Sequence, residues 1–323
     1  MTSITLANNP GKSAQTTEGN AIDVRAVSKF YGTLHAVDGI DLTVQRGEIF
    51  GLIGHNGAGK STLFKMMLGL IAPSAGEILI NGTAVTGSEF RHTRRQLGYL
   101  PENVVLYDNL SGLETLKFFA KLKGAPSAQC APMLERVGLA HAVNRPLREY
   151  SKGMRQRLGF AQALLGDPRV LFLDEPTNGL DPQAIRDFYA TLRGLRDSGV
   201  TIIITSHILA ELQERVDRLA IMAAGKIQAL GSVAALREQM HMPLKMELGL
   251  SPADVVIAQQ ALQEIRGTNH AISSTVTAQG LSVSCPRDAK MAVLAAIMGL
   301  GGRLLDLSIQ EPSLEDVFFG FSD

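Results

Sequence analysis

The sequence predicts an α/β fold in which helices cover both faces of a mainly parallel sheet, followed by a smaller α+β unit. The first observation is a set of three nearly continuous apolar runs, EIFGLIG, RVLFLDE and VTIIITSH, which suit strands buried on both faces. Each run ends in polar or Gly-rich residues, and ligands gather at the carboxyl ends of strands in such sheets. The second observation is a change in the sequence pattern after Glu238, where predicted strands and helices follow in the order β-α-β-β-α-β.

The bulk composition is that of a globular protein with more than one domain. The chain has 323 residues, of which 45% are hydrophobic and 19% charged, with a mean hydropathy of +0.10. Lys plus Arg and Asp plus Glu each number 31, so no basic excess points to nucleic acid or to an anionic membrane. Cys130 and Cys285 are far apart, which argues against a disulfide framework or a cysteine metal site. No apolar run approaches the ~20 residues that span a bilayer.

Residues 1–20 are predicted to form a disordered tail before the first domain. They are polar and lack the apolar segment of a secretory signal. The segment PGKS at Pro10–Ser13 has part of a phosphate-loop pattern, but neither a preceding strand nor the upstream glycine. We therefore exclude it as a nucleotide site.

Residues 21–238 are predicted to form the first domain. The stretch DLTVQ alternates between polar and apolar residues, which predicts a half-buried strand. A helical region is expected from about Ser111 to Leu165. Ser111 and Glu114 form a capping-box pattern at its start, and helix capping fully explains the motif LSGLE.

Residues 243–323 are predicted to form a ferredoxin-like module after the linker QMHMP. Its strands and helices are PLKMELGL, SPADVVIAQQALQEI with Ser251 as cap, a hairpin turning at Gln279–Gly280, RDAKMAVLAAIMGLGG and RLLDLSIQ. An amphipathic helix, SLEDVFFGF, is expected to close the chain. No chemical motif appears here, so we expect no catalytic role.

The segment GHNGAGKST, Gly54–Thr62, matches a phosphate loop between the strand EIFGLI and the helix STLFKMMLGL. Its glycines allow backbone N–H groups to surround phosphate oxygens where side chains would collide. Lys60 can reach the β- and γ-phosphates, and Ser61 can ligate Mg²⁺. A chance Gly-rich turn is disfavoured by the flanking elements. We expect nucleotide contacts from Gly54, Asn56, Gly57, Ala58, Gly59, Lys60, Ser61 and Thr62.

Side chains after the other two buried strands complete the expected site. Asp174 can hold Mg²⁺ through its water shell, and Glu175 can act as general base toward a water that attacks the γ-phosphate. Two solvated turn acids are the alternative. His207 is expected to contact the γ-phosphate, although a lone histidine is often structural. Tyr31 can stack on adenine, with a core aromatic as the alternative.

The stretch YSKGMRQR, Tyr150–Arg157, predicts a second anion site. A serine and a glycine lead into a helix, which is how backbone N–H groups are presented to an anion. The phosphate loop is already present about a hundred residues earlier, so this second site needs a separate explanation.

The motifs GHNGAGKST, YSKGM, VLFLDEPTNGLD and TSH, in this order and spacing, resemble those of an ATP-binding-cassette (ABC) ATPase over about Ile22 to Glu238. The resemblance implies a P-loop NTPase with a RecA-like core, an antiparallel β subdomain and a helical subdomain. It also implies that Ser151 and Gly153 bind ATP held by the phosphate loop of a second copy, in a head-to-tail homodimer. The turn Asn178–Asp181 resembles the D-loop at the same interface, and hydrolysis would separate the two copies.

The stretch LGYLPENVVLY takes the position of the Q-loop, with Glu102 where much of the superfamily has Gln. The resemblance gives Glu102 a place beside Mg²⁺ and the γ-phosphate, where its charge can loosen ATP or alter the position of water. Glu is also found here in ABC exporters of drugs and polysaccharides, which end in a module resembling Glu311–Phe318. His55 stands where such proteins usually have Pro, without consequence for a loop that binds through its backbone.

A closer resemblance, through LGYLPENV, LSGLETLKFFAKLKGA, VGLAHA and YSKGMRQRLGFAQALLGDPR, is to the ABC ATPases of nitrous oxide reductase maturation, which are described as copper-processing. It implies a membrane permease and a periplasmic maturation protein as partners, with the ATPase peripheral on the cytoplasmic face of the inner membrane. Met240–Met242 has ligands that suit Cu(I), but linker packing explains the segment better.

The leading function is therefore the ATP-hydrolysing motor of a membrane ABC transporter. It predicts a groove beside Glu102–Asp108 that receives a permease helix. A drug or polysaccharide exporter is the alternative substrate class. A soluble ABC ATPase that acts on nucleic acid or ribosomes is disfavoured, because the chain has one cassette, no long coiled-coil insertion and a neutral charge balance. Glu175 and His207 together disfavour a binding module without hydrolysis.

Overall fold

The computed structural model describes residues 19–208, 212–239, 243–266 and 272–310. Most of the predicted tail, the PGKS segment, Met240–Met242, the predicted last helix and Glu311–Phe318 lie outside the described residues. Among the helices that are described, none combines the length and the apolar character needed to cross a bilayer.

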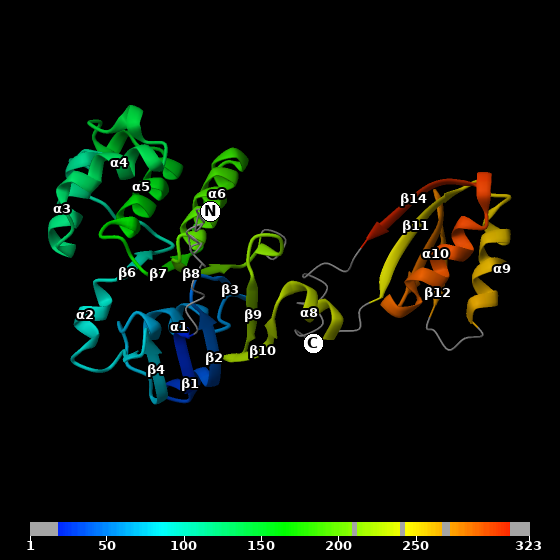
Figure 1. The fold of residues 1–323 in the computed structure, drawn as a ribbon, viewed down its shortest axis with the longest axis horizontal. Helices are drawn as coiled ribbons and strands as arrows, with labels where there is room; N and C mark the ends of the chain where they lie inside the picture. Colours follow the sequence, from blue (N-terminus) through cyan, green and yellow to red (C-terminus); the bar gives the residue numbers. More distant parts are fainter. Residues whose placement is uncertain (1–18, 209–211, 240–242, 267–271, 311–323) are drawn as a thin grey trace, which may run out of the picture.

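A six-stranded sheet forms the centre of the larger part of the molecule (Figure 1). Its order is β10-β9-β3-β8-β7-β6. The three predicted buried strands are neighbours in it and run parallel, namely β3 (Ile49–Gly54), β8 (Thr201–Ser206) and β7 (Val170–Asp174). Every residue of these three strands is buried, which confirms the interpretation of the continuous apolar runs. The outer members are β6 (Leu97–Leu100), β9 (Arg218–Ala223) and the antiparallel β10 (Lys226–Gly231).

A second, antiparallel sheet covers one side of this core. Its strands are β2 (Leu34–Gln45), β1 (Asn20–Tyr31), β4 (Ala75–Ile80) and β5 (Thr83–Ala84), in that order. In β2 the residues of DLTVQ alternate between exposed and buried, as predicted. Helix α1 (Lys60–Met67) packs with both sheets in one apolar cluster, where the ring of Phe64 meets the edge of Phe172 at 5.5 Å. The short α2 (Phe90–Arg94) follows.

The helical region lies beside the central sheet (Figure 1). It contains α3 (Gly112–Lys123), α4 (Cys130–Arg136) and α5 (Lys152–Leu164), with short 3₁₀ turns between them. The capping box at the start of α3 is confirmed: Ser111 Oγ accepts the N–H of Glu114, and Glu114 Oε2 accepts the N–H of Ser111. Helix α6 (Pro182–Asp197) joins the same core. Helix α8 (Val233–Gln239) ends this part of the chain.

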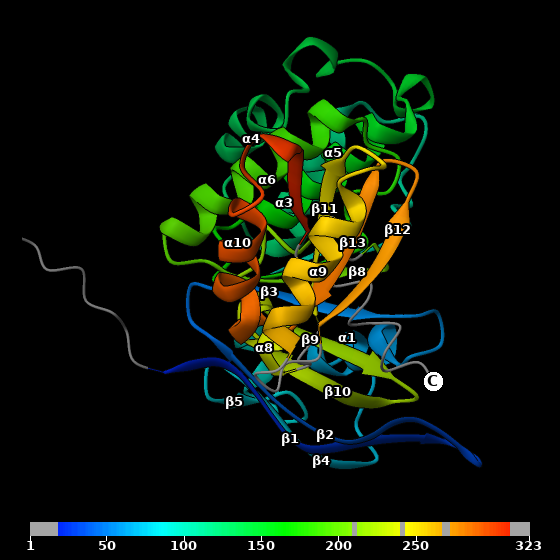
Figure 2. The ribbon, with the colours of Figure 1, turned by 90° about the vertical axis from the view of Figure 1, so that its right-hand side faces the viewer.

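The remaining described elements form a small α+β unit with its own apolar core (Figure 2). They are β11 (Leu244–Leu250), α9 (Val255–Arg266), β12 (Ser273–Thr277), β13 (Gly280–Cys285), α10 (Lys290–Met298) and β14 (Leu304–Gln310). The strand order is β12-β13-β11-β14, and all pairs are antiparallel.

The prediction that Ser251 caps the first helix of this unit is wrong. Helix α9 begins at Val255, and Asp254 precedes it, with its carbonyl accepting the N–H of Ala258. The hydroxyl of Ser251 donates instead to the Asp254 carboxylate at 2.6 Å. Residues 252–254 form a turn, whereas a cap at Ser251 would have placed them in the helix.

Candidate functional site

The carboxyl ends of β3, β8 and β7 meet at one edge of the central sheet. This arrangement follows from the parallel pairing of β3 with β8 and of β8 with β7. It brings together the phosphate-loop segment after Gly54, the acids at Asp174 and Glu175, and His207. The prediction that the three strand ends converge is confirmed.

The loop after β3 requires glycine at two close backbone approaches. A Cβ on Gly54 would lie 2.5 Å from the carbonyl oxygen of Met222, and one on Gly59 would lie 2.3 Å from that of Ala36. Gly57 and Gly59 also have positive φ angles of 87° and 101°, which other residues rarely adopt. The loop is therefore held between β9 and β2 in a shape that a side chain would break.

Lys60 begins α1 and bends back over this loop. Its Nζ donates to the carbonyl oxygens of Gly54 at 2.5 Å and His55 at 3.1 Å. Burial lowers the pKa of Lys60, and the charges of Glu175, Asp174 and Glu102 oppose that effect. The charges of all three carboxylates thus act on the ammonium group.

A cavity of about 470 Å³ opens above the loop. Its lining consists of residues 55–62 together with Tyr31, Leu34, His35, Ala36, Ala224 and Gly225. Tyr31 is 50% exposed at this cavity, so the alternative of a core aromatic is excluded. Its ring lies under the Lys29 ammonium group, 5.4 Å from its centre. The cavity thus combines backbone N–H donors, a cation and an exposed aromatic face.

Thr205, which no sequence motif marks, orders both acids at the end of β7. Its hydroxyl donates to Asp174 Oδ1 at 2.6 Å and accepts the backbone N–H of Glu175 at 3.0 Å. Glu175 has a left-handed φ of 47°, which is strained for a residue with a Cβ. Both acids are buried, which excludes the alternative that they are solvated turn residues. The position of Thr205 two residues before His207, on the neighbouring strand, was the available signal.

His207 lies against Glu175. Its Nδ1 is 2.8 Å from Glu175 Oε2. The imidazole is about half exposed, whereas the glutamate side chain is only 11% exposed. This contact leaves Nε2 of the histidine available for another partner.

Ser151 and Gly153 stand at the start of α5, away from the residues that line the cavity over Lys60. Ser151 is exposed, and its Oγ accepts the N–H of Met154 at 3.2 Å as an N-cap. A Cβ on Gly153 would lie 3.1 Å from the carbonyl oxygen of Gly179. Gln156 Nε2 donates to the carbonyl of Pro176 at 3.0 Å. Helix α5 is thereby tied to the Asn178–Asp181 turn of its own chain.

The expected Mg²⁺ ligands are hard oxygen groups, which this ion prefers. Asp174 directs Oδ1 to Thr205, which leaves its second oxygen for a metal or for water. Ser61 lines the cavity beside Lys60. Glu102 is exposed in the loop after β6 and does not line the cavity, although its charge acts on Lys60. Within the described part of the chain, no three His, Cys, Asp or Glu side chains are grouped as a metal site.

An apolar surface lies beside the loop after β6. Val105 is 88% exposed and Tyr107 is 63% exposed. The Tyr107 ring meets the edge of Phe118 in α3 at 6.3 Å, and Phe118 contacts Phe119. Phe119 in turn lines a groove of about 320 Å³, whose other walls are Arg94, Leu97, Tyr99, Leu122, Lys123, Gln162 and Ala163.

Comparisons with known proteins agree with this geometry. The family model described as ABC transporter matches residues 37–178. An uncharacterized ABC transporter ATP-binding protein of Synechocystis sp. is 35% identical, over 93% of this chain and 84% of the relative. The daunorubicin resistance ATP-binding protein of Streptomyces coeruleorubidus is 34% identical, over 92% of this chain and 94% of the relative. A solved structure of an ATP-binding subunit of an ABC transporter has 33% identity and a TM-score of 0.64, over 68% of this chain and 93% of that one.

Proposed function

The chain belongs to the ABC transporter family as an ATP-binding subunit with ATPase activity coupled to transport, and on this premise we propose that it drives a membrane permease as a head-to-tail homodimer. The observation that carries the proposal is the separation of two anion-binding elements in one chain. The cavity over Lys60 is lined without Ser151 or Gly153, and both are held at the start of α5. A second copy is needed to bring the two elements onto one nucleotide.

In this proposal the phosphate loop holds ATP through Asn56, Gly57, Ala58, Gly59 and Lys60, which line the cavity, and through Gly54, which ends β3 just before them. Ser61 and Thr62 follow at the start of α1. Tyr31 stacks on the adenine. Mg²⁺ would be held by Ser61 and Asp174, with Glu102 nearby, and would neutralise charge on the phosphates. Thr205 orients Asp174 for this role.

We assign proton transfer to Glu175. Its carboxylate takes the proton of the water that attacks the γ-phosphate, and the bond from that phosphorus to the bridging oxygen breaks. His207 holds Glu175 Oε2 through Nδ1, and Nε2 is left to contact the γ-phosphate. The hydrogen bond from Glu175 N–H to Thr205 fixes the backbone of the base.

Ser151 and the backbone of Gly153 would close over the γ-phosphate held by the other copy, at the positive end of α5. Gln156 joins α5 to Pro176, which follows the base Glu175. Closure of the dimer at α5 would therefore be coupled to hydrolysis through this hydrogen bond. Loss of the γ-phosphate removes what holds the copies together.

We propose that the apolar surface formed by Val105, Tyr107, Phe118 and Leu122 contacts a helix of the permease, in or beside the groove lined by Phe119. The ATPase would then lie peripherally on the cytoplasmic face of the inner membrane. The unit over residues 243–323 is proposed as an accessory module to a cassette over 21–238.

We propose that the transport driven by this ATPase supports copper-site assembly of nitrous oxide reductase. A periplasmic maturation protein would be reached through the permease. The support is the resemblance through the helical region, from LSGLETLKFFAKLKGA to YSKGMRQRLGFAQALLGDPR. Export of a drug is the second candidate. It is supported by relatives whose names give daunorubicin and linearmycin resistance, each covered over more than nine-tenths of its length.

The test is deletion of the gene, with the copper content and activity of nitrous oxide reductase as readouts. We expect a copper-deficient, inactive enzyme that is restored by the intact gene and not by a Glu175→Gln copy. Unchanged reductase copper with new sensitivity to a drug would reject the copper assignment in favour of export.

A further inference from the structure

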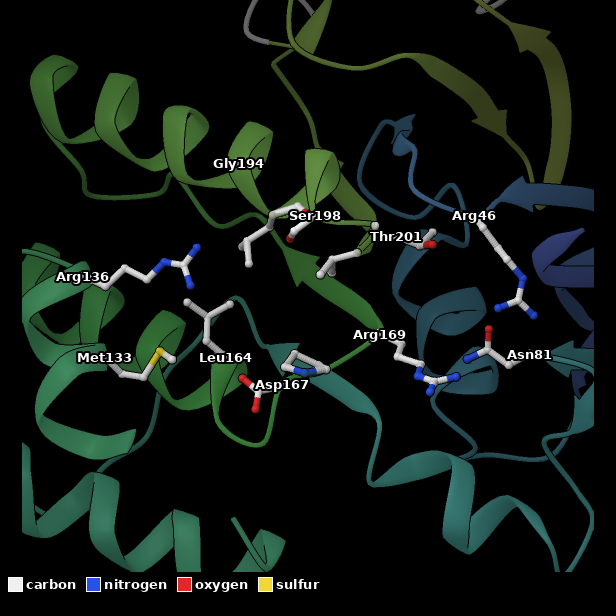
Figure 3. Close-up of a pocket in the computed structure, with 14 residues that line it drawn as sticks. Arg46, Asn81, Met133, Arg136, Leu164, Asp167, Arg169, Gly194, Ser198 and Thr201 are labelled. Carbon is white, nitrogen blue, oxygen red and sulfur yellow. The ribbon is translucent and has the colours of Figure 1, made fainter. Parts of the chain in front are cut away.

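A large cavity lies at the opposite edge of the central sheet from the nucleotide site. It has a volume of about 630 Å³, within the range of small-molecule pockets (Figure 3). Its lining includes Arg169, directly before β7, and Thr201, at the start of β8. Asp174 and Ser206 mark the other ends of these two strands, so the length of the strands separates the cavity from the phosphate loop.

One end of this cavity gathers hydrogen-bond donors. Arg46 follows β2, Asn81 follows β4, and Arg169 precedes β7, and Figure 3 shows their side-chain ends directed toward one another. The amide nitrogen of Asn81 is buried and has no hydrogen-bond partner among the described residues. Among the described residues, the guanidinium groups of Arg46 and Arg169 have neither a carboxylate partner nor a hydrogen-bond acceptor. Three segments that are distant in sequence thus present donors to one space.

The charge balance of the cavity is positive. Arg136 on the opposite wall adds a third unpaired guanidinium group among the described residues. Asp167 is the only carboxylate in the lining, and its Oδ2 already accepts a hydrogen bond from Gln129 at 2.8 Å. All three arginines are exposed, so their guanidinium groups stay hydrated in the unliganded protein and are available to an anion.

The other end of the cavity is apolar. Met133 and Leu164 lie beside Arg136 in Figure 3, and Leu195 and Val200 also line the space. A ligand that fills the cavity would therefore be anionic at one end and carry a carbon body at the other. Guanidinium groups bind phosphate oxygens through paired, charge-assisted hydrogen bonds.

We propose that this cavity binds a small organic phosphate, with the phosphate at Arg46, Asn81 and Arg169 and the carbon body against Met133 and Leu164. The site is separate from the ATP site and does not depend on the transported substrate. The occupant contacts residues at the starts of β7 and β8, whose opposite ends hold Asp174 and Thr205.

The test uses the full chain saturated with ADP, so that the phosphate loop is filled, and phenyl phosphate as the probe in calorimetric titration. We expect one saturable site per chain that binds phenyl phosphate more tightly than inorganic phosphate. Arg169→Gln and Arg46→Gln should each lower the affinity about tenfold or more, because each removes charge-assisted hydrogen bonds. Circular dichroism should show unchanged folding, since neither side chain has a partner to lose among the described residues.

The matched control is Arg25→Gln, which removes an exposed arginine that pairs with the exposed Glu77 at 3.6 Å. It should leave the affinity unchanged. The proposal is overturned by the absence of saturable binding to the ADP-saturated chain, or by equal losses in the control and the cavity variants. A parallel titration without ADP identifies the first case: binding seen only there would place the probe at the phosphate loop.

Discussion

Nδ1 of His207 lies 2.8 Å from Oε2 of Glu175, and the two residues stand at the carboxyl ends of neighbouring parallel strands. The hydrogen bond from the Glu175 N–H to Thr205 helps to hold this residue at its strained φ of 47°. A carboxylate held in this way needs little reorganisation to accept a proton from a bound water.

Replacing this carboxylate by an amide should therefore stop hydrolysis without disturbing nucleotide binding. We expect Glu175→Gln to lower kcat about 100-fold or more, the usual contribution of a general base, with an ATP affinity close to that of the wild type. Steady-state phosphate release and equilibrium binding of ATP measure the two effects. Glu77→Gln, at an exposed ion pair, is the control and should keep full activity. An ordinary rate in Glu175→Gln would remove Glu175 from the role of base.

Tyr31 should contribute to ATP affinity through its exposed ring. We expect Tyr31→Ala to weaken ATP binding about tenfold, since stacking of a base on an aromatic side chain contributes about 1–3 kcal/mol. Tyr31→Phe keeps the ring and should bind ATP almost as well as the wild type. Equal affinities in all three proteins, measured by fluorescent nucleotide displacement, would show that the ring does not touch the base.

Glu102 should oppose the binding of ATP, because it adds a negative charge near Lys60. We expect Glu102→Gln to tighten ATP binding a few-fold, in line with about 1 kcal/mol for a close exposed charge pair. The gain should shrink as the salt concentration rises, since salt screens exposed charges. Weaker binding in the variant would instead mean that the carboxylate helps to hold the metal.

Lys123 gives the protein a pH-dependent stability of defined sign. Burial lowers its pKa to about 8, and the charge of Asp167 opposes the shift. Between pH 8 and the ordinary value of 10.5 the unfolded chain binds more protons than the folded chain, so this group makes stability rise with pH. At pH 7 the folded protein holds a partly desolvated charge.

We therefore expect Lys123→Met to stabilise the protein at pH 7, by on the order of 1 kcal/mol, and to remove part of the rise between pH 8 and 10. Denaturant unfolding at several pH values measures both effects. Lys121→Met, at an exposed lysine of the same helix, is the control and should leave the slope unchanged. A slope that stays the same in Lys123→Met would contradict the assignment.

The elements that the sequence predicted best are those whose signal is local. The runs EIFGLIG and VTIIITSH are continuous because β3 and β8 are covered on both faces, and the start of α3 is marked by the reciprocal pair Ser111 and Glu114. The helix after Ser251 was misplaced because a turn at residues 252–254 competes with the cap.

What the sequence could not give is contact between distant segments. The role of Thr205 depends on β8 pairing with β7 in register, which sets Asp174 opposite Thr205. The cavity with Arg46, Asn81 and Arg169 depends on the meeting of three strand ends from two sheets. Isolated residues such as these belong to no sequence motif, so their shared site becomes visible only in the folded structure.

The central claim is that each ATP lies between Lys60 of one copy and Ser151 of the other. Asn and Asp both cap a helix as well as Ser does, so Ser151→Asn and Ser151→Asp keep α5 intact and differ by one negative charge facing the γ-phosphate. The measurement is the mass of both proteins by light scattering, in the Glu175→Gln background with ATP. We predict about twice 34.6 kDa for Ser151→Asn, and the mass of a single ATP-bound chain for Ser151→Asp. An ATP-dependent dimer in Ser151→Asp as stable as that in Ser151→Asn would contradict the claim.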